Sequence, residues 1–343
     1  MPDVSAYTTL RLGGPARRLV PAASAEEIVR ATRAGYEAGT PVLVLAGGSN
    51  VVVGDGEFPG TVVLLRSTGV ESKVDGRTVH LTVAAGEPWD AVVAAAVDAG
   101  WAGIECLSGI PGSTGATPIQ NVGAYGQEVA ETITAVQVWD RVTDQIQTIG
   151  PDECGFAYRT SVFKRSDRWV VLSVDFQLAV SDRSGPVRYD ELAGALGVPL
   201  GATAPLAEVR AAVLKLRAGK GMLIDDADPD TYSAGSFFTN PVLDAAAFAA
   251  LRANTGGEPP SWPGEGGVVK ISAAWLIDRA GFTKGYGHGD GVAISTKHAL
   301  SLTNRGTGTT AGLLALAREI RDGVHERFGV TLHPEPVLVN CEL

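Results

Sequence analysis

The sequence predicts an α+β fold divided over two or three domains. The chain has 343 residues, which is more than one ordinary domain needs. With 45 % hydrophobic and 19 % charged residues, its composition is that of a chain with buried cores. Short apolar runs typical of strands recur at 42–45, 51–53, 60–65 and 79–83, and an antiparallel meander is expected from the runs at 135–139, 145–148 and 169–178.

Helices are expected between and after these strands. Ser24 and Glu27 have the spacing of a capping box, which predicts a helix that continues to about Ala38. A second helix is expected over 87–99, with Pro88 in its first turn. Apolar residues at helical spacing predict two further helices near the C-terminus, at 272–279 and 309–327.

Charge and cysteine content exclude several classes of protein. The net charge is −10, from 28 basic and 38 acidic residues, so neither nucleic acid nor an anionic membrane is an expected partner. The three cysteines are far apart, which argues against disulfides and a cysteine zinc site, and no metal site is expected. The N-terminus lacks the pattern of a signal peptide, and the longest apolar run, 91–97, is too short to cross a membrane. We therefore expect a soluble cytoplasmic protein.

The first motif with chemical meaning is the stretch Gly47-Gly48-Ser49-Asn50 between two apolar strands. Two adjacent glycines let backbone N–H groups approach an anion without interference from Cβ atoms, which suits a phosphate or pyrophosphate. A hairpin turn that uses glycine and asparagine for positive φ explains the same residues equally well.

The second motif is the long segment 104–128, IECLSGIPGSTGATPIQNVGAYGQE. It is rich in glycine, small hydroxyl side chains and amides, and few charges interrupt it. A purely structural loop of this length and apolar character would be unusual. A buried backbone packed against a cofactor is the favoured interpretation.

Together with TTLRLGGPA at 8–16, these two segments resemble the FAD-binding module of the UDP-N-acetylenolpyruvoylglucosamine reductase (UDP-N-acetylmuramate dehydrogenase) family. They resemble the vanillyl-alcohol-oxidase-type flavin domains more distantly. The likeness continues in family order over nearly the whole chain, through AYRTSVFK (157–164), SAGSFFTNPV (233–242), VKISAAWLIDRAG (269–281), KHALSLTN (297–304) and HPEPVLV (333–339).

The resemblance implies a particular domain organisation. It is an FAD-binding vanillyl-alcohol-oxidase-type module of two subdomains, followed by an α+β substrate-binding domain. The first subdomain would comprise 1–68 and 331–343, the second 69–203, and the UDP-sugar domain 204–330. A weak compositional boundary near 197–205, rich in Gly, Pro and Ala, agrees with the last division.

The resemblance also implies non-covalent FAD as cofactor and NADPH as co-substrate. The residues that match the family's FAD-binding positions are Ala46, Gly47, Gly48, Ser49, Asn50, Ser108, Gly109, Gly112, Ser113, Gly115, Ala116, Asn121, Gly123 and Ala124.

Three residues match the family's catalytic trio. Ser236 is the proton donor that the resemblance implies, and Arg159 would hold the substrate carboxylate through its planar guanidinium. Glu335 could act only when protonated, which burial would favour by raising its pKa. Judged without the resemblance, a turn cap, a surface ion pair and a solvated acid are the simpler interpretations.

The substrate-binding positions implied by the family are Tyr189, Lys220, Asn240, Lys270 and His298, and Tyr189 indicates the tyrosine-loop subclass. Two departures stand out, because Thr239 replaces a frequent lysine and Trp262 a frequent tyrosine. The acidic stretch Asp225–Asp230 looks like an insertion, and a solvated loop is expected there in preference to a calcium site.

The implied activity is the NADPH-dependent reduction of UDP-N-acetylglucosamine enolpyruvate to UDP-N-acetylmuramate, a cytoplasmic step of peptidoglycan precursor synthesis. The oligomeric state stays open. Two alternatives remain at this point: an FAD-linked sugar or alcohol oxidase of the same flavin fold, and a flavin- or sugar-nucleotide-binding protein without catalysis.

Overall fold

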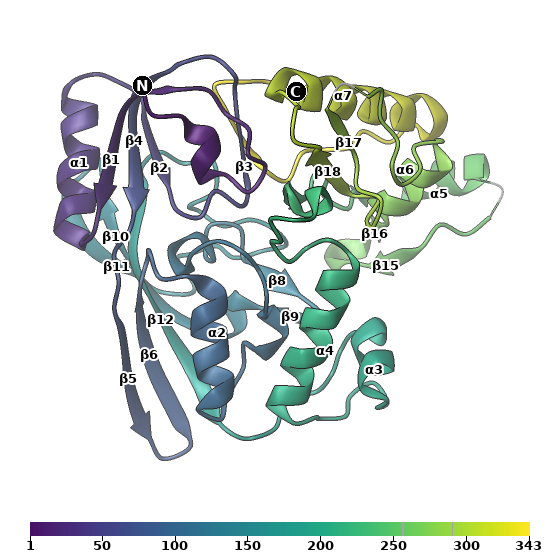
Figure 1. Ribbon diagram of the computed structural model, residues 1–343. Coiled ribbons are helices and arrows are strands. Elements are labelled where there is room, and N and C mark those ends of the chain that lie inside the picture. The colour runs from purple at the N-terminus through teal and green to yellow at the C-terminus, as the bar shows by residue number, and fades with distance from the viewer. Residues whose placement is uncertain (256, 290) are drawn as a thin grey trace. The chain divides into compact units, whose positions relative to one another are not determined.

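The computed structural model describes residues 1–255, 257–289 and 291–343 (Figure 1). The chain folds into two compact units between which it passes several times. Unit 1 comprises Met1–Pro2, Ala16–Gly47 and Pro59–Leu223. Unit 2 comprises Asp3–Pro15, Gly48–Phe58 and Ile224–Leu343. Mixed helix and sheet content confirms the α+β class in both.

A small three-stranded sheet opens unit 1, in the order β1-β4-β2, with β2 and β4 parallel. The elements of this region are β1 (Ala16–Ala22), α1 (Ala25–Glu37), β2 (Val42–Leu45) and β4 (Phe58–Leu65). Ser24 caps α1 as expected, because its side chain accepts the N–H of Glu27 at 3.2 Å. The Glu27 carboxylate accepts the N–H of Ala23 at 2.8 Å, and both contacts satisfy donors at the start of the helix.

A larger antiparallel sheet carries the main core of unit 1, in the order β11-β10-β12-β6-β5, with β7 paired to β12. Its strands are β5 (Val70–Asp75), β6 (Thr78–Ala84), β7 (Trp101–Ala102), β10 (Ile133–Asp140), β11 (Gln145–Ile149) and β12 (Trp169–Val180). The expected meander is wrong in one respect, since β12 pairs with β10 and not with β11. The reason is burial. Many residues of β12 are buried, and this strand lies inside the sheet, whereas β11 is mostly exposed and forms the edge.

The helix α2 (Trp89–Asp98) contributes its apolar face to this core. Trp89 is fully buried, and its ring lies 5.6 Å from that of Phe176 on β12. Pro88 stands at the N-cap, one position before the first helical residue, and not inside the first turn as expected. The helices α3 (Asp190–Leu196) and α4 (Leu206–Gly219) close unit 1 and share a smaller apolar cluster.

Unit 2 combines short strands with three longer helices. A three-stranded sheet has the order β13-β18-β17, a second has the order β14-β16-β15, and β3 pairs in parallel with β19. The strands are β3 (Val51–Val53), β13 (Ser233–Ser236), β14 (Val242–Leu243), β15 (Ser261–Pro263), β16 (Val269–Ile271), β17 (Val292–Ile294), β18 (Ser301–Asn304) and β19 (Val337–Val339).

The helices of unit 2 are α5 (Ala245–Thr255), α6 (Ala273–Arg279) and α7 (Thr310–Phe328). The expected helices near the C-terminus are confirmed, and Ser272 and Thr309 cap α6 and α7. Ile320 on α7 and Leu276 on α6 are fully buried in one core with Phe237. That core supports the residue directly after Ser236.

The acidic stretch Asp225–Asp230 is exposed over its first three residues, as expected for a solvated loop, but its last residue is buried. Asp230 is only 4 % exposed and accepts hydrogen bonds from Thr296 and Arg305. Asp228 pairs with Lys297, and Asp226 pairs with Arg11. Local sequence does not show these partners, because they lie far away along the chain.

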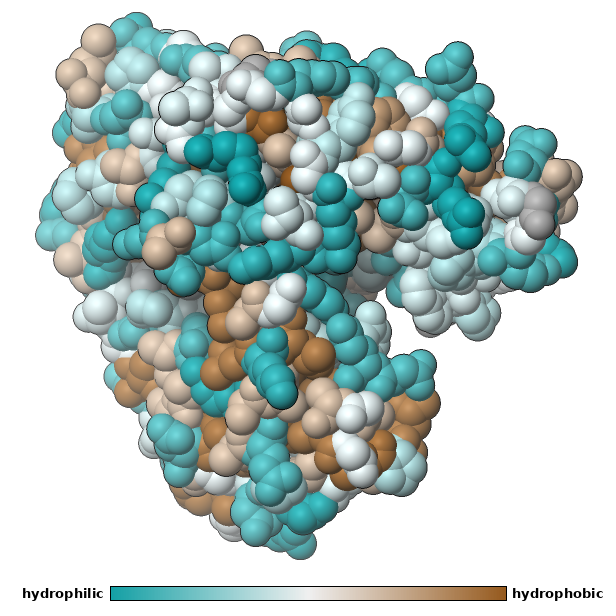
Figure 2. Space-filling view, turned by 45° about the vertical axis from the view of Figure 1, so that its right-hand side comes forward, coloured by the Kyte–Doolittle hydropathy of each residue, from teal (hydrophilic) through white to brown (hydrophobic). Residues whose placement is uncertain are grey.

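Figure 2 shows that hydrophilic residues cover much of the surface on that face and that apolar residues gather in a few areas. Across the described part of the chain, none of the helices combines the length and apolar character that crossing a membrane requires.

Candidate active site

The glycine pair after β2 is required by close backbone packing within each unit. A Cβ atom on Gly47 would lie 2.6 Å from the Cα of Gly112 in unit 1. In unit 2, a Cβ on Gly48 would lie 2.0 Å from the carbonyl oxygen of Tyr7, and its φ is +60°. No side chain fits at either position without moving backbone. The adjoining Ala46, Ser49 and Asn50 complete this turn.

The segment 104–128 folds into tight turns with little regular structure. It contains the 3₁₀ turns Glu105–Leu107 and Thr114–Ala116 and the short strands β8 (Gly123–Ala124) and β9 (Gln127–Glu128). A Cβ on Gly115 would lie 2.5 Å from the Cβ of Ala85. Gly109 and Gly112 have φ values of +71° and +110°. The glycines of this segment therefore serve turns and close packing.

One buried polar atom in this segment is left unsatisfied by the protein. The Ser113 hydroxyl is buried and has no hydrogen-bond partner among the described residues. Such an atom costs free energy unless something supplies a partner. A bound group with polar oxygens or nitrogens would do so, and glycines that admit no Cβ line the same segment. The residues present fit a cofactor bound mainly through backbone.

Other predicted cofactor residues have their side chains engaged within the protein. The amide nitrogen of Asn121 donates to Glu128 at 2.7 Å, and its oxygen accepts the N–H of Ala130 at 3.1 Å. The Ser108 hydroxyl donates to the carbonyl of Glu105 at 2.6 Å. These side chains hold the loop in shape, which leaves its backbone as the surface available to a ligand.

Asp90, which sequence reasoning missed, anchors this loop from helix α2. Its carboxylate accepts the N–H of Gly109 at 2.5 Å and both terminal nitrogens of Arg210, at 2.6 and 2.9 Å. Burial opposes ionisation of Asp90, but the hydrogen bonds from Arg210 and Gly109 outweigh it and lower the pKa. Asp90 and Arg210 are 120 residues apart, so no local pattern signals the pair.

Arg159 lies in unit 1 at the tip of a tight turn closed by Ala157 and Thr160, which pair through two bonds of 3.2 Å. Its φ of +54° is unusual for a residue with a side chain. The guanidinium donates to the carbonyl of Gly123 at 2.7 Å. A predicted catalytic residue is thus held directly against a predicted cofactor residue within one unit.

Tyr189, also in unit 1, stands at the N-cap of α3 and is 43 % exposed. Its ring lies edge-on to Tyr125 at 5.7 Å. The Lys220 ammonium lies 5.5 Å from the Tyr125 ring and pairs with Glu191 at 2.5 Å. Burial raises the pKa of Tyr125 to about 12, so this phenol stays a neutral hydrogen-bond donor.

Unit 2 brings Ser236 and Glu335 to neighbouring segments. Ser236 ends β13, where it stands opposite Ser301 of β18. The N–H of Glu335 donates to the carbonyl of Phe237 at 2.9 Å, and Pro334 and Phe238 form a further bridge. Both Ser236 and Glu335 are half-buried. The main chain thus brings the segments that carry Ser236 and Glu335 next to one another within unit 2.

The remaining predicted substrate residues lie in unit 2 on three different elements. Asn240 uses its side-chain oxygen to accept the N–H of Ala273 at the start of α6, at 2.9 Å. Lys270 on β16 stands opposite Trp262, with its ammonium 5.7 Å from that ring. His298 lies in the turn between β17 and β18, and its N–H donates to the Ser295 hydroxyl at 3.3 Å.

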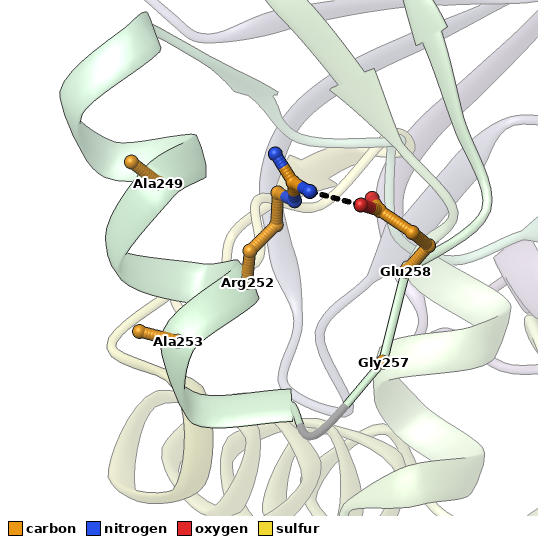
Figure 3. A pocket seen from close by; sticks show the side chains of 5 residues that line it. All are labelled: Ala249, Arg252, Ala253, Gly257 and Glu258. Atoms are coloured by element: carbon orange, nitrogen blue, oxygen red, sulfur yellow. Dashed lines mark hydrogen bonds and ion pairs between the residues drawn. The ribbon is translucent and has the colours of Figure 1, made fainter.

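A separate hollow of about 410 Å³ lies beside α5 and contains none of these residues. It is lined by Ala249, Arg252, Ala253, Gly257 and Glu258. Figure 3 shows the Arg252 and Glu258 side chains facing one another across it. Because these two charges already pair, the hollow offers a ligand little beyond small alanine surfaces.

Comparison with known proteins identifies the family. Residues 228–339 match the family description "UDP-N-acetylenolpyruvoylglucosamine reductase, C-terminal domain", and residues 16–149 match "FAD binding domain". These two matches together span more than half of the chain.

Full-length relatives agree with this assignment. UDP-N-acetylenolpyruvoylglucosamine reductase of Salinispora arenicola is 66 % identical over 99 % of this chain and 95 % of its own length. The protein of the same name from Thermobifida fusca is 55 % identical over 98 % of this chain and 96 % of its own. The crystal structure of the Thermus caldophilus reductase is 27 % identical, with a TM-score of 0.66 over 98 % of this chain and 97 % of that one. The chain therefore belongs to the UDP-N-acetylenolpyruvoylglucosamine reductase family.

Proposed function

We propose that this protein reduces UDP-N-acetylenolpyruvoylglucosamine to UDP-N-acetylmuramate with electrons from NADPH, in the synthesis of peptidoglycan precursors. The observation that carries the proposal is the hydrogen bond from the N–H of Glu335 to the carbonyl of Phe237, the residue after Ser236, found in a chain that matches reductases of this name over nearly its full length. A proton donor and a second acid on neighbouring segments suit the reduction of an enol ether.

FAD, when bound, would take hydride from NADPH and pass it to the substrate. We assign its binding to the glycine turn at 46–50 and to the segment 108–124. Support comes from the unsatisfied Ser113 hydroxyl and from the glycines that leave no room for a Cβ atom. The Ser113 side chain and nearby backbone would supply the hydrogen bonds to such a cofactor.

Ser236 is proposed to supply the proton. Addition of hydride to the terminal carbon of the enolpyruvyl group leaves negative charge on the carbon that bears the carboxylate. A positioned hydroxyl can protonate so strong a base even though serine is a weak acid. The N–H of Phe237, the residue after Ser236, donates to the carbonyl of Leu300, the residue before β18, at 2.7 Å, and this bond helps to position Ser236.

Arg159 and Glu335 are proposed to stabilise the developing charge. The planar guanidinium of Arg159 suits a carboxylate, and its fixed turn limits the entropy lost when it binds one. Glu335 would act in its protonated form, because a second anion beside the charge would oppose the reaction.

The nucleotide is proposed to bind through Tyr189, Lys220, Asn240, Lys270 and His298. A diphosphate would compete with Glu191 for the Lys220 ammonium. The amide nitrogen of Asn240 is the donor that remains for a ligand, since its oxygen serves α6. We further propose that the reaction takes place in the cytoplasm. The UDP-sugar domain expected over 204–330 divides between the two units, because residues up to Leu223 belong to unit 1 and residues from Ile224 on belong to unit 2.

The test is anaerobic stopped-flow spectroscopy of the flavin. NADPH should bleach the flavin absorbance, and UDP-N-acetylenolpyruvoylglucosamine should then restore it, with UDP-N-acetylmuramate as the product. Failure of the sugar nucleotide to reoxidise the flavin would refute the proposal. Fast reoxidation by oxygen alone would indicate the oxidase alternative.

A further inference from the structure

The acidic stretch before Ser236 is built into unit 2 by two ion pairs. Asp230 lies three residues before Ser233, the first residue of β13. Its carboxylate accepts from Arg305 at 2.6 Å and from both the N–H and the hydroxyl of Thr296. Two residues earlier, Asp228 pairs with Lys297.

Two of these partners, Thr296 and Lys297, belong to one turn, residues 295–301, which joins β17 to β18, and Arg305 follows β18 at its other end. Inside this turn, the Ser295 hydroxyl accepts the N–H groups of Lys297 at 3.0 Å and His298 at 3.3 Å. Ser295 also donates its N–H to the carbonyl of Ser301 at 2.8 Å. The backbone around His298 is therefore held from within by short-range bonds.

The same turn is tied to the strand that carries Ser236. The N–H of Phe237 donates to the carbonyl of Leu300 at 2.7 Å, and Ser236 stands opposite Ser301. At the other end of β18, the N–H of Asn304 donates to the carbonyl of Tyr232 at 3.0 Å. A shift of the turn would move the backbone on both sides of Ser236.

The contacts of Asp230 favour its ionised form. Burial disfavours its ionised form, but the hydrogen bonds from Thr296 and the charge of Arg305 outweigh burial and lower the pKa of Asp230. Removing a charge that is buried and paired leaves its partner unsatisfied. The change would leave unsatisfied donors at Thr296, inside the turn, and at Arg305, directly after β18.

We propose that Asp228 and Asp230 are positioning residues for the sugar-nucleotide half of the reaction: they hold the 295–301 turn, and through it His298 and the strand of Ser236. We assign neither carboxylate a contact with the reacting atoms. The inference rests on the proposed function, since it assigns His298 and Ser236 to the substrate.

The decisive variant is Asp230→Asn, compared with Glu319→Gln. Glu319 also lies in unit 2 and accepts from Tyr286 at 2.6 Å and from His288 at 2.7 Å, so its variant controls for a general loss of stability. Asp226→Asn controls for loss of an exposed acidic charge, because the Asp226 side chain is 87 % exposed.

We expect Asp230→Asn to raise the apparent Kd for UDP-N-acetylenolpyruvoylglucosamine about tenfold in the second half-reaction. Reduction of the flavin by NADPH and the flavin content should stay at wild-type values. Both control variants should bind the sugar nucleotide as the wild type does. An unchanged apparent Kd in Asp230→Asn, or an equal rise in Glu319→Gln, would overturn the proposal.

A milder variant decides the question if Asp230→Asn does not fold. Thr296→Val removes one hydroxyl donor to Asp230 but keeps the N–H donor and Arg305. A rise of about threefold in the apparent Kd would support the proposal, and no rise would overturn it. If the wild-type protein itself did not turn over the sugar nucleotide, the proposed function would be refuted instead.

Discussion

The main-chain N–H of Glu335 donates to the main-chain carbonyl of Phe237 over 2.9 Å. Phe237 directly follows Ser236, so this bond joins two segments that are distant in the sequence. Phe237 and Phe238 are both 1 % exposed and fix the strand from the core side. The proposed donor and the proposed acid are thus held by backbone and core packing, and their side chains can be changed without removing that support.

Replacement of Ser236 with alanine should separate the two half-reactions. The change removes the proposed proton donor, and the proposal gives Ser236 no part in the reduction of the flavin by NADPH. Reduction by NADPH should proceed at the wild-type rate, and reoxidation by the sugar nucleotide should slow by about 10²- to 10⁴-fold. Stopped-flow absorbance of the flavin measures both rates on one sample.

Ser261→Ala is the matched control for this experiment, because Ser261 lies on β15 in the same unit and has no proposed role. It should leave both half-reactions at wild-type rates. If Ser236→Ala reoxidised as fast as the control, Ser236 would have to be removed from the mechanism.

Glu335→Gln tests the second acid. Glutamine keeps the size and a hydrogen-bond donor but cannot release a proton under these conditions. We expect slower reoxidation by the sugar nucleotide with unchanged flavin content and unchanged reduction by NADPH. The measurement is the same stopped-flow assay. Glu342→Gln is the control, because Arg318 donates to the main-chain carbonyl of Glu342 and the variant keeps this bond. Equal rates in both variants would exclude Glu335 from catalysis.

Local patterns predicted most of the secondary structure because they depend on neighbours along the chain. The cap at Ser24 and the apolar face of α7 are signals of this kind, and both helices formed where expected. The partner of β12 could not be predicted in the same way. The pairing of β12 with β10 depends on which strand can lie between two other strands, and this is a property of the whole sheet.

In the candidate site, too, local features could be predicted from the sequence and long-range contacts could not. The glycines at 47 and 48 could be singled out because adjacent glycines mark backbone that tolerates no Cβ. The burial of Asp230 could not, since its partners Thr296 and Arg305 lie 66 and 75 residues away. The sequence shows which residue types are present, and long-range pairing decides which of them are buried.

Gly47→Ala should reduce the amount of bound FAD. The new methyl group would lie 2.6 Å from the Cα of Gly112, so backbone in the proposed cofactor loop must move. We expect a lower ratio of flavin to protein absorbance in the purified variant and incomplete recovery when FAD is added. Gly194→Ala is the control, because a Cβ there meets nothing within 4 Å and alanine favours helix α3. Full flavin content in Gly47→Ala would contradict the proposed binding segment.

A buried carboxylate in unit 1 should control the stability of the protein in acid. Asp140 is fully buried and accepts from two nitrogens of Arg168, at 2.9 and 2.7 Å, and from Gln147 at 2.9 Å. These bonds, the one from Arg168 above all, hold the pKa of Asp140 far below its ordinary value. The unfolded chain therefore binds a proton at this site at a higher pH than the folded chain does. The free energy of unfolding consequently falls as the pH is lowered from about 4 toward the pKa of the folded state.

Asp140→Asn should lower the melting temperature at neutral pH, because it leaves the Arg168 guanidinium without its anion. It should also flatten the fall of the melting temperature between about pH 5 and pH 3, since the titrating group is gone. Circular dichroism at a series of pH values measures both effects. Asp167→Asn is the control, because that carboxylate pairs with Arg141 at the surface and is 72 % exposed. A variant at Asp140 that kept the wild-type slope in acid would show that another group carries the pH dependence.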